Sequence, residues 1–232
     1  MNQKNLEKIF FSKVYKGKSR YPFYRSIFYW LLDAVKLIGQ NNNFKILNIY
    51  SAHDKSSERE DVYKNHFFNN ANYQELDFFK DNIALIPFAD NSFDLVITTK
   101  VILEHVSNPQ KFLDESFRVL KKGGHGFFIA PLIRRQHQVP YDFFRFTQFG
   151  LENLLKKSGF KIDYIKPTNG AVTTAAFMST FFVSGQPWPW FCKKLFFSFL
   201  KFIVDPVANF LDYYDEDRNI PLYFLVKTEK ES

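Results

Sequence analysis

The chain has 232 residues, of which 46% are hydrophobic and 24% are charged. This length and composition suit one packed α/β domain with appendages, and they leave little room for two full domains. The formal net charge is +7, but no RNA-binding aromatic motif accompanies the basic residues, so the sequence disfavours a nucleic-acid partner.

The only cysteine is Cys192, which excludes an intramolecular disulfide. No Cys/His cluster has the spacing of zinc ligands, so the sequence predicts no metal site. The N-terminus carries lysines without the apolar segment of a signal peptide. These features predict a cytoplasmic protein.

Residues 1–43 form a basic, aromatic N-terminal extension that ends in a helix. Four apolar residues recur at spacings of three and four, which predicts one buried helical face over residues 21–39: Ile27, Leu31, Val35 and Ile38. Gly39 ends this helix. The main domain then spans residues 44–232.

Two strands open the main domain. The first is Phe44 to Ile49, and the second is Tyr73 to Asp77, after a highly charged segment. The second strand ends on a carboxylate, Asp77, which is a typical ribose ligand when it lies at the end of a strand.

The most informative stretch runs from Ile86 to Val106 and reads I-P-F-A-D-N-S-F-D-L-V-I-T-T-K-V-I-L-E-H-V. Its apolar residues are consecutive between Leu95 and Ile97, which indicates a strand, Phe93 to Thr98, that is covered on both faces. Asn108 and Pro109 begin a helix that we expect to reach about Lys121 and to end at Gly123, before a strand at residues 127–130.

A further helix is predicted from Thr147, as its cap, to Gly159. Strands at residues 160–165 and 222–226 flank an aromatic amphipathic insertion at about residues 170–215. A helix predicted at residues 191–211 is too short and too charged to span a bilayer. Its apolar face, with Trp188 and Trp190 nearby, suits either a membrane surface or a homodimer interface at residues 188–204.

The motifs I-P-F-x-D-N-S-F-D-L-V, L-E-H-V and L-K-K-G-G, in this order, resemble the class I S-adenosylmethionine-dependent methyltransferases. The resemblance covers roughly residues 44–165. It implies a Rossmann-like α/β fold with a mostly parallel seven-stranded sheet, helices on both faces and the last strand inserted antiparallel. It also implies S-adenosylmethionine as the cofactor.

The resemblance assigns seven residues to the cofactor site: Asn48, Ser51, Ala52, Asp77, Asn82, Ile83 and Thr98. The sequence departs from the family where Asn48 stands in place of an acidic residue and Tyr50-Ser51-Ala52 replaces a glycine-containing loop. Because glycine allows the closest backbone approach, this departure predicts weak or absent cofactor binding.

The block H-x-x-P-x-D-F-F-R-F-T resembles one subset of these methyltransferases, in which the corresponding loop covers the acceptor. His137 is our first candidate for the base and Asp142 the second, with Arg145 as the group that binds an anionic acceptor. An alternative is that Asp142 and Arg145 pair and only hold the loop. For Glu104 and His105 we favour a structural role over catalysis.

The expected function is methyl transfer to a small-molecule, glycan or lipid-linked acceptor. A catalytically inactive scaffold that attaches to a membrane or a protein partner is the alternative, since the glycine loop is missing. An RNA methyltransferase ranks last because it rests on net charge alone. The expected location is cytoplasmic, with peripheral attachment to the inner face of the membrane as an option.

Overall fold

The computed structural model describes residues 3–14, 22–39, 43–50, 61–69, 71–77 and 85–231. The helices are α1 (Gln3–Ile9), η1 (Phe10–Val14), α2 (Pro22–Ile38), η2 (Tyr63–Phe67), η3 (Leu103–His105), α4 (Pro109–Val119), α5 (Gln148–Lys157), α6 (Ala171–Gly185), α7 (Trp190–Phe199), η4 (Leu200–Val204) and α8 (Asp205–Asp212). The strands are β1 (Lys45–Tyr50), β2 (Asn72–Asp77), β3 (Phe93–Ile97), β4 (Leu120–Pro131), β5 (Lys161–Pro167) and β6 (Tyr223–Glu229).

The strands form one mostly parallel sheet in the order β2-β1-β3-β4-β6-β5. Strands β2, β1, β3 and β4 pair in parallel, and β6 is antiparallel to both β4 and β5. The antiparallel insertion of the last strand is confirmed. The sheet has the expected Rossmann-like arrangement with helices on both faces.

The expectation of seven strands is corrected to six within the described residues. Side chains of α4 hold the backbone of the approach to β3. Arg118 donates to the carbonyl oxygens of Ile86 and Phe88 at 2.9 and 2.8 Å, and the carboxylate of Glu115 accepts from the Ile86 N–H at 3.0 Å.

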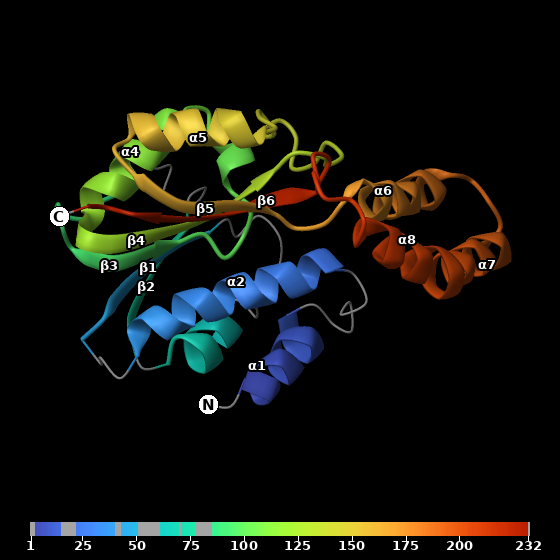
Figure 1. The fold of residues 1–232 in the computed structure, drawn as a ribbon, viewed down its shortest axis with the longest axis horizontal. Helices are drawn as coiled ribbons and strands as arrows, with labels where there is room; N and C mark the ends of the chain where they lie inside the picture. Colours follow the sequence, from blue (N-terminus) through green and yellow to red (C-terminus); the bar gives the residue numbers. More distant parts are fainter. Residues whose placement is uncertain are drawn as a thin grey trace.

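Helices α4 and α5 cover one face of the sheet, and α2 lies across the other with α1 beside it (Figure 1). The helix predicted at residues 21–39 is confirmed, and Gly39 adopts a positive φ of 55° at its end. Trp30 of α2 donates its ring N–H to the Val226 carbonyl at 3.0 Å. Buried residues of α1, η1 and α2 share one hydrophobic core with the sheet.

The predicted helix caps are confirmed, whereas one helix end is corrected. Asn108 accepts from the Lys111 N–H at 3.0 Å, and Thr147 accepts from the Gly150 N–H at 3.1 Å. Helix α4 ends at Val119 instead of at about Lys121, and β4 begins directly at Leu120. A distant residue explains the early end, because Lys230 donates to the last carbonyls of α4, including Phe117 at 2.9 Å.

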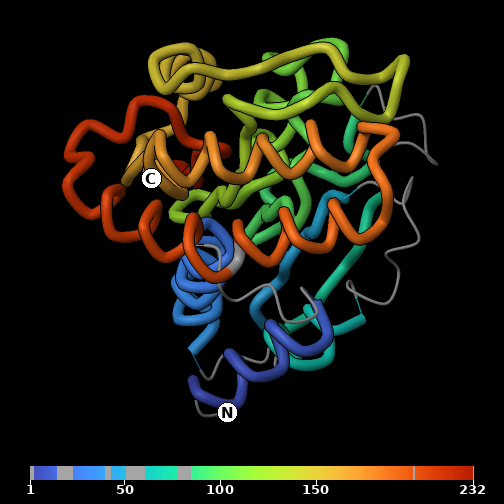
Figure 2. Tube along the Cα trace, turned by 90° about the vertical axis from the view of Figure 1, so that its right-hand side faces the viewer, coloured from blue at the N-terminus to red at the C-terminus, as the bar shows by residue number. Residues whose placement is uncertain are grey.

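Helices α6, α7 and α8 project from the end of the sheet at which β4 and β5 finish (Figures 1 and 2). The turn η4 connects α7 to α8. The helix predicted at residues 191–211 is therefore interrupted by the wider turn η4. This turn precedes Pro206, whose ring cannot fit beside the carbonyl of a regular helical turn. None of the helices among the described residues is both long and apolar enough to cross a bilayer.

Two carboxylates fasten this helical insertion to itself. Asp212, at the end of α8, accepts from the N–H groups of Gly170, Val172 and Thr173 at 2.8, 3.0 and 3.3 Å. Asp215 accepts from the Ala171 N–H at 2.9 Å. These bonds satisfy donors at the start of α6 that have no partner within the helix.

Candidate functional site

The carboxyl ends of the parallel strands bring together several residues that the sequence assigned to a cofactor. Tyr50 at the end of β1 lies in register with Asp77 at the end of β2. Thr98 directly follows β3, the neighbour of β1 on its other side. Open α/β sheets bind ligands at this edge.

Asn48 and Thr98 lie beneath that edge rather than on its surface. Both are fully buried. The Asn48 side-chain oxygen accepts from the N–H and the hydroxyl of Thr99 at 3.2 and 3.0 Å. The Thr98 hydroxyl accepts from the Ile129 N–H at 3.3 Å, so both residues tie neighbouring strands together below the site.

The remaining cofactor candidates, Ser51, Ala52, Asn82 and Ile83, lie outside the described residues. Their role stays a prediction from the sequence. Asp77 is described, and it is half-buried at the edge of the sheet.

The loop that follows β4 folds back over η3. The N–H groups of Phe143 and Phe144 donate to the carbonyl of Glu104 at 2.8 and 3.3 Å. Phe146 donates to the carbonyl of Pro131, the last residue of β4, at 2.8 Å. These bonds bring the three predicted acceptor residues onto the short helix that carries Glu104 and His105.

Within this loop, Asp142 and Arg145 form a paired clamp. The Arg145 guanidinium donates to both Asp142 oxygens at 2.7 and 2.9 Å, and it also donates to the carbonyls of Arg134 and Arg135. The backbone N–H of His137 donates to Asp142 at 2.8 Å. The bonds from Arg145 hold the pKa of Asp142 well below its usual range, so this carboxylate is a poor proton acceptor.

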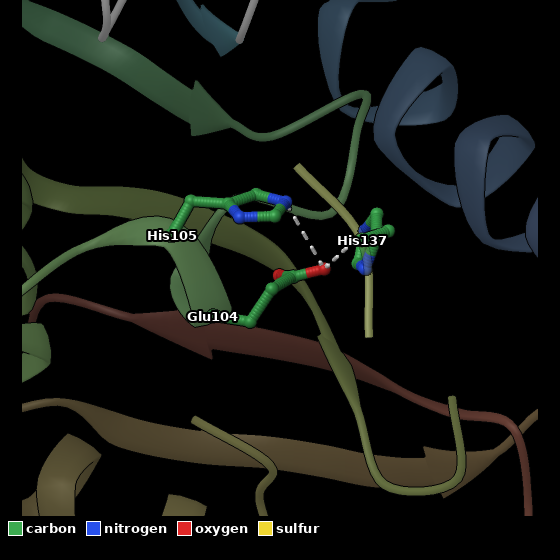
Figure 3. Close-up of side chains that lie close together, drawn as sticks. All are labelled: Glu104, His105 and His137. Carbon is green, nitrogen blue, oxygen red and sulfur yellow. Dashed lines mark ion pairs between the residues drawn. The ribbon is translucent and has the colours of Figure 1, made fainter. Parts of the chain in front are cut away.

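Three side chains from the two segments meet in a cluster that we call the Glu104 cluster: Glu104, His105 and His137 (Figure 3). Glu104 lies between the two imidazoles, with its Oε1 at 3.6 Å from His105 Nε2 and 3.7 Å from His137 Nε2. The two rings are edge to face with centroids 4.9 Å apart.

The tautomer of His105 follows from its neighbour. Its Nδ1 lies 2.5 Å from the carbonyl oxygen of Tyr141. A carbonyl only accepts, so Nδ1 carries the proton and Nε2 presents a lone pair toward Glu104. His137 Nδ1 lies 3.4 Å from the Asp142 carboxylate without a hydrogen bond, and its Nε2 faces Glu104.

Burial dominates the electrostatics of the Glu104 cluster. The Glu104 side chain is 0% exposed, and burial raises its pKa to about 8. Burial and the nearby Arg134 guanidinium lower the pKa of His137 to about 4, and burial also lowers that of His105. Both imidazoles are therefore neutral at physiological pH, where they act as lone-pair donors.

Sequence reasoning treated Glu104 and His105 as turn residues and placed the acceptor chemistry on His137, Asp142 and Arg145. The structure joins the two sets, since His137 contacts Glu104 across 33 positions of chain, from 104 to 137. In the sequence, only the adjacent Glu-His pair after a buried strand pointed to this cluster. Nothing in the sequence pointed to Arg134, whose charge lowers the pKa values of all three side chains.

Comparison with known proteins gives a family match. Residues 41–128 match the family model for a methyltransferase domain. A ubiquinone/menaquinone biosynthesis C-methyltransferase, UbiE, of Roseobacter denitrificans is 36% identical over 75 residues, which cover 32% of this chain and 30% of that protein. A demethylmenaquinone methyltransferase of Renibacterium salmoninarum is 46% identical over 50 residues, or 22% of this chain and 21% of that protein.

Among solved structures, a provisionally named sarcosine dimethylglycine methyltransferase from Galdieria sulphuraria has a similar fold. The TM-score is 0.50 at 13% identity, and the match covers 89% of this chain and 86% of that chain. The chain therefore matches a methyltransferase domain over residues 41–128 and has the fold of class I methyltransferases.

Proposed function

We propose that this protein is an active class I methyltransferase that transfers a methyl group from S-adenosylmethionine to a small-molecule, glycan or lipid-linked acceptor. One observation carries the proposal. The strand ends with Tyr50, Asp77 and Thr98 and the loop with His137 gather at the same edge of the sheet. Cofactor and acceptor can therefore meet there.

The described residues fit the cofactor. Asp77 is a half-buried carboxylate at the end of β2, where it suits the two ribose hydroxyls. Asn48 and Thr98 would support the floor beneath the cofactor. Ser51, Ala52, Asn82 and Ile83 lie outside the described residues, and only the resemblance in sequence assigns them to the cofactor. The cofactor supplies an activated methyl group, so the protein mainly has to align the acceptor.

The acceptor would lie against the loop after β4. Tyr141, Phe143 and Phe144 are partly exposed aromatic side chains beside the Glu104 cluster, and such rings suit the stacking of a sugar or another ring. With a hydroxyl acceptor, His137 Nε2 would accept the hydroxyl proton, while the cofactor, when bound, would supply the methyl group and leave as the demethylated thioether. Asp142 and Arg145 hold that imidazole in place.

The helical insertion favours an acceptor at a membrane surface. The insertion contacts the acceptor loop directly, since the Arg135 guanidinium lies 4.6 Å from the centre of the Phe181 ring on α6. Its outer face exposes large apolar side chains, among them Trp190 at 74% and Leu195 at 72%. An interfacial helix has this character, with lysines beside an apolar face.

Flotation with vesicles that contain anionic lipids tests this attachment. Binding to the vesicles supports a membrane-linked acceptor. A lipid-independent dimer that dissociates in the Phe199→Glu variant would instead assign residues 188–204 to self-association.

Isothermal titration with S-adenosylmethionine tests the enzyme proposal. We expect saturable binding, weaker than usual for the fold because the glycine loop is replaced, and weaker still in the Asp77→Ala variant. The absence of both titration heat and thermal stabilisation at millimolar cofactor would contradict the proposal. The protein would then be a scaffold that keeps the fold without the reaction.

A further inference from the structure

The Glu104 cluster contains a buried acid that the fold leaves without a hydrogen bond. Within the described residues neither carboxylate oxygen of Glu104 has a hydrogen-bond partner, and the side chain is fully buried. The two nearest imidazole nitrogens lie at 3.6 and 3.7 Å, beyond a hydrogen bond. Burying a carboxyl group without a hydrogen bond destabilises the fold, and a bound ligand would offset this cost.

We propose that Glu104, His105 and His137 bind a single divalent transition-metal ion such as Zn²⁺ or Mn²⁺. Their ligand atoms all lie within 4.8 Å of one another. Metal bonds of about 2.0–2.2 Å place neighbouring ligand atoms roughly 3–3.5 Å apart, so a small contraction around the ion is sufficient. Two imidazoles and one carboxylate are a common ligand set for such ions.

The groups behind the ligands support this assignment. The Tyr141 carbonyl accepts from His105 Nδ1, and the Asp142 carboxylate faces His137 Nδ1. Metal-binding histidines almost always place their second nitrogen against a carbonyl or a carboxylate, which orients the ring. Arg145 pairs with Asp142 and thereby holds this carboxylate in place behind His137.

Three protein ligands leave coordination positions for water or for an acceptor oxygen. A role of the ion in binding the acceptor rests on the proposed methyltransferase function. With the ion bound, His137 would be a ligand rather than the base. An acceptor hydroxyl whose oxygen contacts the ion would release its proton to solvent water more readily. The same loop carries three partly exposed aromatic side chains, Tyr141, Phe143 and Phe144.

The test is titration of protein that carries no polyhistidine tag and has been stripped with EDTA. We expect one equivalent of Zn²⁺ or Mn²⁺ by calorimetry, much weaker binding of Mg²⁺, and visible absorption bands when Co²⁺ is added. Glu104→Gln and His137→Ala should each weaken binding by about 100-fold or more, since loss of a supporting residue alone costs 10- to 100-fold.

His125→Ala is the matched control, because His125 lies on β4 with Nδ1 at 3.3 Å from the Thr228 carbonyl, outside the cluster. This variant should bind the ion normally. Absence of one-equivalent binding in the parent protein overturns the proposal, and so does binding that survives both Glu104→Gln and His137→Ala. Thermal melting in EDTA checks folding, and His137→Asn serves if Glu104→Gln does not fold.

A parallel titration of the stripped protein with S-adenosylmethionine separates the two proposals. Cofactor binding without metal binding leaves the methyltransferase proposal intact and overturns the metal site. Metal binding without cofactor binding would support the metal site and contradict the methyltransferase proposal.

Discussion

Two parts of the molecule at the same end of the sheet depart from ordinary burial in opposite directions. The Glu104 cluster buries an acid and two imidazoles, whereas the helices α7 and α8 expose tryptophan, phenylalanine and leucine. Helix α7 has no buried residue at all among those described. Buried polar groups and exposed apolar surface are the two departures that carry functional information.

The two parts also differ in how their side chains are held. The loop over the Glu104 cluster is fixed by a carboxylate and a guanidinium that are engaged with each other and with backbone. The outer face of α7 has no such ion pair; α7 is joined to the end of α6 by a hydrogen bond from Lys193 to the Ser184 carbonyl, and Asp212 of α8 fastens the start of α6. Changes in the cluster should therefore affect both stability and chemistry, while changes on the outer face should affect attachment alone.

The largest expected effect is on turnover. His137→Ala should lower turnover by about 10² to 10⁴, because either the base or a ligand of the acceptor-activating ion is lost. Affinity for S-adenosylmethionine should stay nearly unchanged. Single-turnover rates at saturating cofactor measure the change once an acceptor is found, with His125→Ala as the control. Full turnover in the His137→Ala variant would show that His137 takes no part in the reaction.

The second effect is on stability. Arg145→Ala should lower the free energy of unfolding by about 2–4 kcal/mol, because it leaves the Asp142 carboxylate buried without its main partner. The Asp142 side chain is only 2% exposed. Urea denaturation at neutral pH provides the measurement.

A matched control is the Lys36–Asp33 pair, which has the same spacing along the chain but is exposed. Lys36→Ala should cost less than about 1 kcal/mol. Equal losses in the two variants would mean that the Asp142–Arg145 pair does not hold the loop.

The third effect concerns the attachment of the helical insertion. Gly170→Ala should destabilise the protein by about 1–3 kcal/mol, since the new methyl group has no room. A Cβ at this position would lie 2.6 Å from the Asp215 carboxylate and 2.7 Å from that of Asp212.

Gly185, at the other end of α6, is the control because a Cβ there meets nothing within 4 Å. Gly185→Ala should leave the melting temperature unchanged or slightly raised. A similar loss at both positions would show that the carboxylates do not fix the start of α6.

The smallest expected effect on stability is on the outer face of α7. Phe199→Glu should change the free energy of unfolding by no more than about 0.5 kcal/mol, because the ring is already half exposed. Vesicle flotation should nevertheless fall strongly. Tyr29→Glu, at an equally exposed ring on α2, should leave flotation unchanged. A large loss of stability in Phe199→Glu would mean that this face packs within the protein.

Much of the sheet could be predicted from local patterns. The consecutive apolar run at residues 95–97 indicated a strand covered on both faces, and Asn108, Thr147 and Gly39 marked helix ends that the structure confirms. These signals are local, because a cap or a covered strand depends on residues a few positions apart. Contacts between distant segments were not predicted in this way: the hydrogen bonds of Arg118 and Glu115 to the segment before β3 come from a helix about 30 residues away.

The sequence by itself predicted the Rossmann-like fold and the antiparallel last strand. Only the tertiary structure brought the side chains of the Glu104 cluster together. The sequence predicted no metal site because ligand spacing along the chain was the criterion, yet Glu104 and His137 are 33 positions apart and meet only when the loop after β4 folds over η3. Likewise, burial shifts the pKa of Glu104 to about 8, and burial is a property of the packed fold rather than of the residue.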